Sequence, residues 1–83
     1  MKLITDLRQR HLEAWEREFN SRRGDDTGVS TFRGTVVRAA LAAGWFGEDG
    51  DPDTVDDMTP RDVRKWAAAV DELYNEVTTL DPN

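Results

Sequence analysis

The clearest pattern of apolar and polar positions lies near the end of the chain, from Thr59 to Leu80. Apolar residues recur there every three or four positions, at Val63, Trp66, Ala67, Val70, Leu73, Tyr74 and Val77. This spacing lines one face of an α-helix. Thr59 is suited to cap the first free amides, and Pro60 to occupy the first helical position. The pattern therefore predicts an amphipathic C-terminal helix whose apolar face must be buried against another element.

A first helix is predicted over residues 6–22, where apolar residues again form a stripe. The stripe consists of Leu7, Leu12, Ala14, Trp15 and Phe19. Thr5 is the expected N-terminal cap of this helix. Gly24 is expected to stop it in the left-handed conformation that glycine adopts without strain. A polar connector, residues 25–28, would then turn the chain toward the next helix.

The second predicted helix begins after Ser30 and ends near Ala43. It is apolar around much of its circumference, which is typical of a central helix with neighbours on several sides. Gly34 is unusual near the start of a helix. A strand over residues 29–37 is the alternative, although its apolar residues do not alternate. Gly44 is expected to end the helix.

An acidic loop, residues 47–58, separates the second helix from the C-terminal one. Asp51 and Pro52 are suited to start one short helical turn within it, with Val55 and Met58 as apolar anchors. Together these elements predict one domain over the whole chain. Its expected fold is all-α, a small three- to four-helix bundle with the acidic loop before the C-terminal helix.

No constellation of residues for catalysis or metal binding is visible. Asp49, Asp51, Asp53, Val55 and Asp57 fall at the first, third, fifth, seventh and ninth positions of a twelve-residue calcium loop. Thr54, however, replaces the required glycine and Pro60 the bidentate glutamate. A solvated loop is therefore favoured over a calcium site. His11 is the only histidine and there is no cysteine, so neither a zinc site nor a nucleophile–base pair can be assembled. We expect no enzymatic activity, no metal and no cofactor.

The charge is negative and unevenly distributed. The net charge is −6, and residues 45–83 carry eleven acidic and three basic side chains. Phosphate contacts need clustered Lys and Arg, so nucleic-acid binding is not expected. A basic protein partner is consistent with this charge. No apolar run reaches the ~20 residues that span a bilayer, no cleavable signal is visible, and a cytoplasmic location is expected.

The aromatic residues are the candidate contacts for a protein partner. Trp15 and Trp66 lie on or beside predicted apolar stripes, where a place in the core is expected. Trp45 and Phe46 directly follow the glycine that ends the second helix. Such a pair either packs back on the last helical turn or forms an exposed docking knob. The candidate protein-binding residues are Trp45, Phe46, Trp66 and Tyr74.

Three segments resemble small proteins from the tail module of long-tailed bacteriophages and prophages, the tail assembly chaperones. The segments 39–46, 55–63 and 70–78 read AALAAGWF, VDDMTPRDV and VDELYNEVT. The resemblance covers roughly residues 30–83 and contains no catalytic motif. It implies a small helical, non-enzymatic protein of the host cytoplasm. Such a protein would bind the tape-measure and tail-tube proteins during assembly and be absent from the finished particle.

Two other functions agree with the same sequence. One is a structural virion protein, a head–tail connector or minor tail protein, which would form a permanent homo-oligomer. The other is an acidic inhibitor that mimics DNA with the aspartates of residues 49–57. A stable ring in solution would favour the connector, and salt-sensitive binding to a basic enzyme would favour the inhibitor.

Overall fold

The structure, a computed structural model, describes residues 1–25 and 28–79. All regular structure in these residues is helical, which confirms the predicted all-α bundle with an acidic loop before the last helix. The α-helices are α1 (Gln9–Arg22), α2 (Val29–Ala42) and α3 (Pro60–Thr78), and the 3-10 helices are η1 (Arg23–Asp25) and η2 (Pro52–Asp57).

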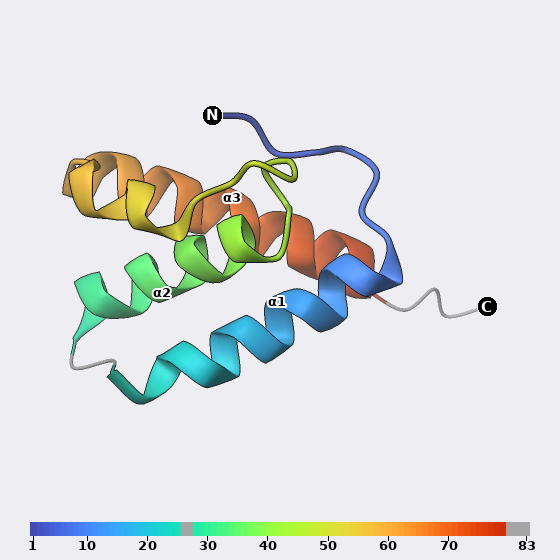
Figure 1. Cartoon of the computed structure of the whole chain (residues 1–83), viewed down its shortest axis with the longest axis horizontal. Coiled ribbons are helices and arrows are strands. Elements are labelled where there is room, and N and C mark those ends of the chain that lie inside the picture. Colours follow the sequence, from blue (N-terminus) through green and yellow to red (C-terminus); the bar gives the residue numbers. More distant parts are fainter. Residues whose placement is uncertain (26–27, 80–83) are drawn as a thin grey trace.

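The second α-helix is the central one, as its wide apolar arc predicts. α1 and α3 each pack along α2 and make few contacts with each other. α2 and α3 run in the same direction, and α1 runs in the opposite direction (Figure 1). The connection between α2 and α3 must therefore return the chain to the starting end of α2. η2 lies within this connection and packs on α2.

The core lies between α2, α3 and this connection. Its buried members are mostly small or β-branched, and they comprise Val36, Val37, Ala40, Leu41, Ala43, Trp45, Val55, Val63, Ala67 and Val70. Small side chains let the helix backbones approach closely. The single large residue among them, Trp45, therefore fills much of the remaining space.

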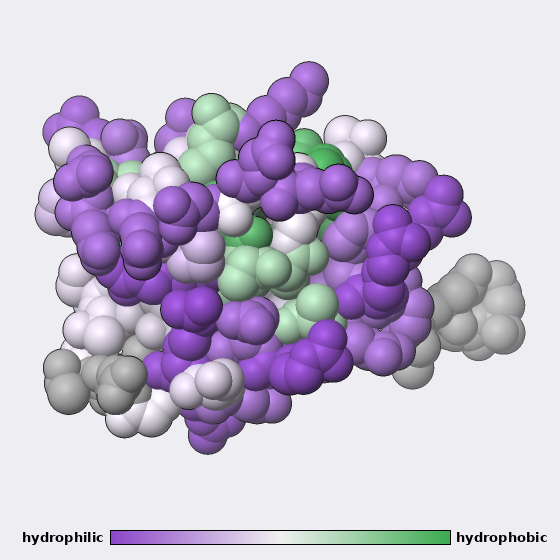
Figure 2. Space-filling view, viewed as in Figure 1, coloured by the Kyte–Doolittle hydropathy of each residue, from purple (hydrophilic) through white to green (hydrophobic). Residues whose placement is uncertain are grey.

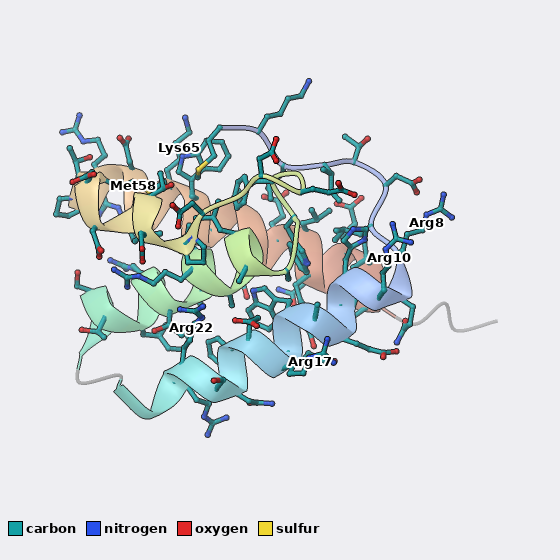
Figure 3. The ribbon with its side chains drawn as sticks, in the orientation of Figure 1. Arg8, Arg10, Arg17, Arg22, Met58 and Lys65 are labelled. Carbon is teal, nitrogen blue, oxygen red and sulfur yellow. The ribbon has the colours of Figure 1, made fainter. Side chains whose placement is uncertain are left out.

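Charged side chains cover much of the surface. The face in Figure 2 is mainly hydrophilic, with a small apolar area near its centre. Figure 3 shows Arg10 and Arg17 on α1 and Arg8 directly before it extending outward, whereas Arg22 lies between α1 and α2 in this view. Arg22 is half-buried there and pairs with Glu18 of the same helix at 3.1 Å.

The first helix begins at Gln9 and not at residue 6, so the prediction of Thr5 as its cap is wrong. The preceding residues form an extended segment without helical hydrogen bonds. In this segment Ile4 donates its backbone N–H to the Trp45 carbonyl at 2.8 Å, and Leu3 and Leu7 pack against the core. Burial of these side chains in an extended conformation competes with an earlier helix start.

The end of α1 also differs from the prediction. The helix tightens into η1, and Arg23 donates its backbone N–H to the Phe19 carbonyl. Gly24 does not adopt a positive φ, so its prediction as a left-handed stop is wrong. The 3-10 turn satisfies the last carbonyls of the helix instead. Residues 26–27 of the predicted connector lie outside the described residues.

The second helix begins at Val29, with Gly28 as its cap, so the alternative strand over residues 29–37 is not formed. Gly34 is buried inside the helix, where an added Cβ would lie 2.9 Å from Nη1 of Arg38. The glycine thus leaves room for the Arg38 guanidinium, which forms an ion pair with Asp56 of η2, within the acidic loop. This pair fastens the loop to the central helix.

The starts of η2, within the acidic loop, and of α3, directly after it, are formed as predicted. Asp51 precedes η2, and its carboxylate accepts the backbone N–H of Asp53 at 2.9 Å. Thr59 caps α3 by accepting the backbone N–H of Asp62 at 3.2 Å. The expected anchors also face inward, since Val55 is buried and Met58 is half-buried.

Candidate functional site

Trp45 belongs to the core, which corrects the expectation of an exposed docking residue. Its side chain is 0% exposed. Gly44 adopts a φ of 84°, and the Trp45 backbone N–H then reaches the Ala40 carbonyl at 2.9 Å. This hydrogen bond belongs to the Schellman motif, which turns the residue after the glycine back onto the helix. The indole N–H also donates to the His11 carbonyl at 2.9 Å, so Trp45 has no free group for a partner.

Phe46 and Trp66 form a separate aromatic pair. Both are half-buried, and their rings meet edge to face with centroids 5.5 Å apart. The Lys65 ammonium lies 5.3 Å from the Trp66 ring centroid, and Lys65 projects on the side of α3 away from α1 (Figure 3). The structure therefore brings two of the four predicted contact residues together, with a cation beside them.

Tyr74, the fourth predicted residue, lies at a groove between α1 and α3. The groove has a volume of about 530 Å³, and residues of α2 form its floor. Its apolar lining comprises Trp15, Phe19, Val29, Phe32, Val36, Ala67, Ala68 and Tyr74. α1 and α3 pack on α2 and hardly on each other, and the starting turn of α2 between them, with Val29 and Phe32, is left partly uncovered. This groove is the candidate functional site.

Trp15 holds the aromatic lining of the groove together. Its ring stacks on Phe19 at 4.9 Å between centroids and lies 5.1 Å from the ring of Tyr74 on α3. The indole N–H donates to the Val36 carbonyl at 3.2 Å, which fixes the ring against α2. Phe19 in turn meets Phe32 edge to face at 5.8 Å. The predicted core residue Trp15 is thus also a wall of the groove.

A hydrogen bond joins α1 to α3 beside Tyr74. The Tyr74 hydroxyl donates to a carboxylate oxygen of Glu16 at 2.9 Å. This hydrogen bond is the main cause that raises the pKa of Tyr74 above its ordinary value, and partial burial and the negative charge of Glu16 add to it. The phenol therefore stays protonated and keeps donating at neutral pH.

Two cations and one anion lie among the apolar residues of the groove. Arg33 comes from α2, and Arg64 and Asp71 come from α3. Neither arginine forms an ion pair within the described residues. The Asp71 carboxylate accepts a weak hydrogen bond from the Asn75 amide at 3.4 Å. Both guanidinium groups are therefore available to acidic groups of a partner.

The acidic loop and His11 have structural roles in the fold. Asp51 caps η2, and Asp56 pairs with Arg38. Nδ1 of His11 accepts the backbone N–H of Arg8 at 2.9 Å in the first turn of α1. Residues 1–25 and 28–79 contain no group of three or more His, Cys, Asp or Glu placed to hold a metal ion. No helix in that part of the chain is long and apolar enough to cross a membrane.

Sequence reasoning missed the exposed residues of the groove, Val29 and Phe32. Both lie on the helix that the sequence predicts to be buried on several sides. Their signal in the sequence is that apolar positions extend to the first turn of the second helix. Reading that signal requires knowing that α1 and α3 diverge there (Figure 1).

The fold and its groove define a small all-α domain with an uncovered apolar surface on its central helix. No protein-family model, curated protein or solved structure matches the chain. The groove itself is therefore the basis for a functional proposal.

Proposed function

We propose that this chain is a non-enzymatic protein-binding module whose groove holds an apolar helix of a partner. The observation that carries the proposal is the exposure of Val29 and Phe32, which are 66% and 48% exposed and line the same groove. Apolar surface left in water costs about 25 cal/mol per Å². Contiguous exposed apolar residues typically mark an interaction site, and a helix laid in the groove would cover both side chains.

Within this class we propose a phage tail assembly chaperone or assembly factor, which binds the tape-measure or tail-tube protein in the host cytoplasm. The likeness of segments 39–46, 55–63 and 70–78 to such proteins supports this choice. A small helical body with an apolar groove also suits transient cover of the apolar face of a helical client. The acidic loop, residues 47–58, would repel acidic segments and attract basic ones.

The test is capture of a client by matched variants. The tagged chain is mixed with the tape-measure or tail-tube protein encoded in the same genome. We expect the wild-type chain to retain the client, and Phe32→Glu to lose it because a charge enters the apolar groove. Val77→Glu is the control, since Val77 is 40% exposed but does not line the groove.

Two results would contradict the proposal. Equal capture by wild type and Phe32→Glu, with circular dichroism showing both folded, would exclude the groove as the binding site. A stable ring of the purified chain, measured by light scattering, would instead favour the structural virion protein.

A further inference from the structure

We infer that the groove selects its partner helix by direction as well as by apolar surface. The partner helix runs antiparallel to α2 and α3, with a basic residue near its N-terminal end and an acidic residue two turns later. This inference rests on the proposed function, because it names the kind of helix that the groove accepts.

The first support is the separation of charge along the groove. Arg64 and Asp71 lie seven residues apart on α3 and line the same groove. Seven residues are about two helical turns, or roughly 10 Å along the axis. Arg33, in the starting half of α2, adds a second cation, while Glu16, which binds Tyr74, adds an anion beside the later part of α3. One end of the groove is therefore cationic and the other is anionic.

The direction of the helices adds to this polarity. α2 and α3 both begin at the same end of the molecule (Figure 1), which is the end where Arg33 and Arg64 lie. The N-terminus of a helix carries partial positive charge and its C-terminus partial negative charge. A partner helix therefore places its C-terminal end, and an acidic residue there, beside the arginines. Its N-terminal end, with a basic residue, then lies beside Asp71 and Glu16.

The apolar lining of the groove determines which residues of the partner helix lie between its basic and its acidic residue. Ala67 and Ala68 lie between Arg64 and Asp71 on α3, and Phe32 and Val36 lie on either side of Arg33 on α2; all four line the groove. A helix presents residues three and four positions apart on one face. The partner thus has a basic residue at position i, apolar residues at i+3 and i+4, and an acidic residue at i+7.

Two synthetic peptides of equal composition test the direction. Both are locked as helices by a side-chain crosslink on the polar face. The first carries Lys at i, Leu at i+3 and i+4, and Glu at i+7; the second has Lys and Glu exchanged. Affinity is measured by calorimetry at low salt. We expect the first peptide to bind about fivefold to tenfold more tightly, because the exchanged peptide recovers both charge pairs only by reversing its direction, which places its positive N-terminus beside the arginines and the N-termini of α2 and α3.

Charge-swapped proteins make the test specific to the groove. The double variant Arg64→Glu with Asp71→Arg should reverse the preference between the two peptides. The matched control is Lys65→Glu with Glu72→Lys, an identical exchange of charge seven residues apart on the same helix but outside the groove. That control should keep the wild-type preference.

The outcomes separate this inference from the proposed function. Equal binding of both peptides by the wild-type chain, abolished by Phe32→Glu, would overturn the direction and leave the groove as a helix site. An unchanged preference in the double variant would also overturn the direction. Failure of both peptides to bind at millimolar concentration would overturn the inference and the groove as a helix site together.

Discussion

The apolar residues at the two ends of the central helix differ in how far they are buried. At the C-terminal end, Leu41 and Trp45 are buried, and Trp45 is 0% exposed. At the N-terminal end, Phe32 is 48% exposed and Val29 is 66% exposed. Both ends carry large apolar side chains, so hydrophobicity alone does not distinguish them.

The difference comes from the chain that is available to cover each end. At the C-terminal end, Gly44 turns the backbone, and the Ile4 amide bonds to the Trp45 carbonyl from the extended N-terminal segment. At the N-terminal end α1 and α3 diverge (Figure 1), and none of the described residues covers the exposed part of the Phe32 side chain. An apolar residue is thus a candidate contact for a partner where no other part of the fold covers its side chain, even when most of its helix is buried.

Replacement of Trp45, at the covered C-terminal end of α2, should have the largest effect on the stability of the fold. Trp45→Ala leaves a large cavity and removes the hydrogen bond from the indole N–H to the His11 carbonyl, which should lower the free energy of unfolding by about 3–5 kcal/mol. This loss is a large share of the stability of a small domain. Urea denaturation followed by circular dichroism measures it. A loss below 1 kcal/mol would show that the indole is not a core residue.

A glycine at the covered end should be nearly as sensitive to an added methyl group. A Cβ at Gly50 would lie 2.8 Å from the Leu41 carbonyl oxygen, whereas one at Gly24 meets nothing within 4 Å. Gly50→Ala should therefore cost about 1–3 kcal/mol, and Gly24→Ala should change stability by less than about 0.5 kcal/mol. Thermal unfolding of the two variants compares them. Equal effects would contradict the close approach of the loop to α2.

At the open end, loss of an aromatic ring should have little effect on folding. Phe32→Ala removes the edge-to-face contact with Phe19 and little buried area, so about 0.5–1.5 kcal/mol should be lost. Its effect on partner binding should be larger than its effect on stability. Denaturation and peptide titration of the same variant check both. A loss of stability as large as that of Trp45→Ala would make Phe32 a core residue.

The smallest expected effect is a dependence on alkaline pH at Tyr74. Its pKa is raised in the folded state, chiefly by the hydrogen bond to Glu16. The resulting stabilisation is complete below the unfolded pKa of about 10 and is lost as pH rises through the folded pKa. Between pH 9 and 11.5, the free energy of unfolding should fall more steeply for wild type than for Tyr74→Phe. Parallel curves would show that this bond does not persist in solution.

Local sequence signals predicted much of the fold. Thr59 and Pro60 mark the start of α3 because capping depends on neighbouring residues alone. The start of α1 was not predictable in this way. There, Leu3 and Ile4 pack as an extended segment near Trp45, a contact between residues more than forty positions apart. Such contacts depend on the assembled fold and override local propensity.

The candidate site was less predictable than the fold. Sequence placed Tyr74 among the contact residues, and Tyr74 does line the groove. The sequence also selected Trp45, because an aromatic residue after a helix-ending glycine is compatible both with a packed cap and with an exposed docking residue. Val29 and Phe32 were missed because their exposure follows from the divergence of α1 and α3. Periodicity reports which face of a helix is apolar, and tertiary packing decides which part of that face is covered.

The most direct test of the groove uses the three tryptophans as reporters of three places. Trp15 lines the groove, Trp45 lies in the core, and Trp66 packs with Phe46 outside the groove. The indole N–H signals of the ¹⁵N-labelled chain are followed by NMR while the Lys-first helical peptide is added. Binding in the groove predicts a large shift for Trp15 and an unchanged signal for Trp66. A shift of Trp66 with an unchanged Trp15 would contradict it and place the partner on the Phe46 side.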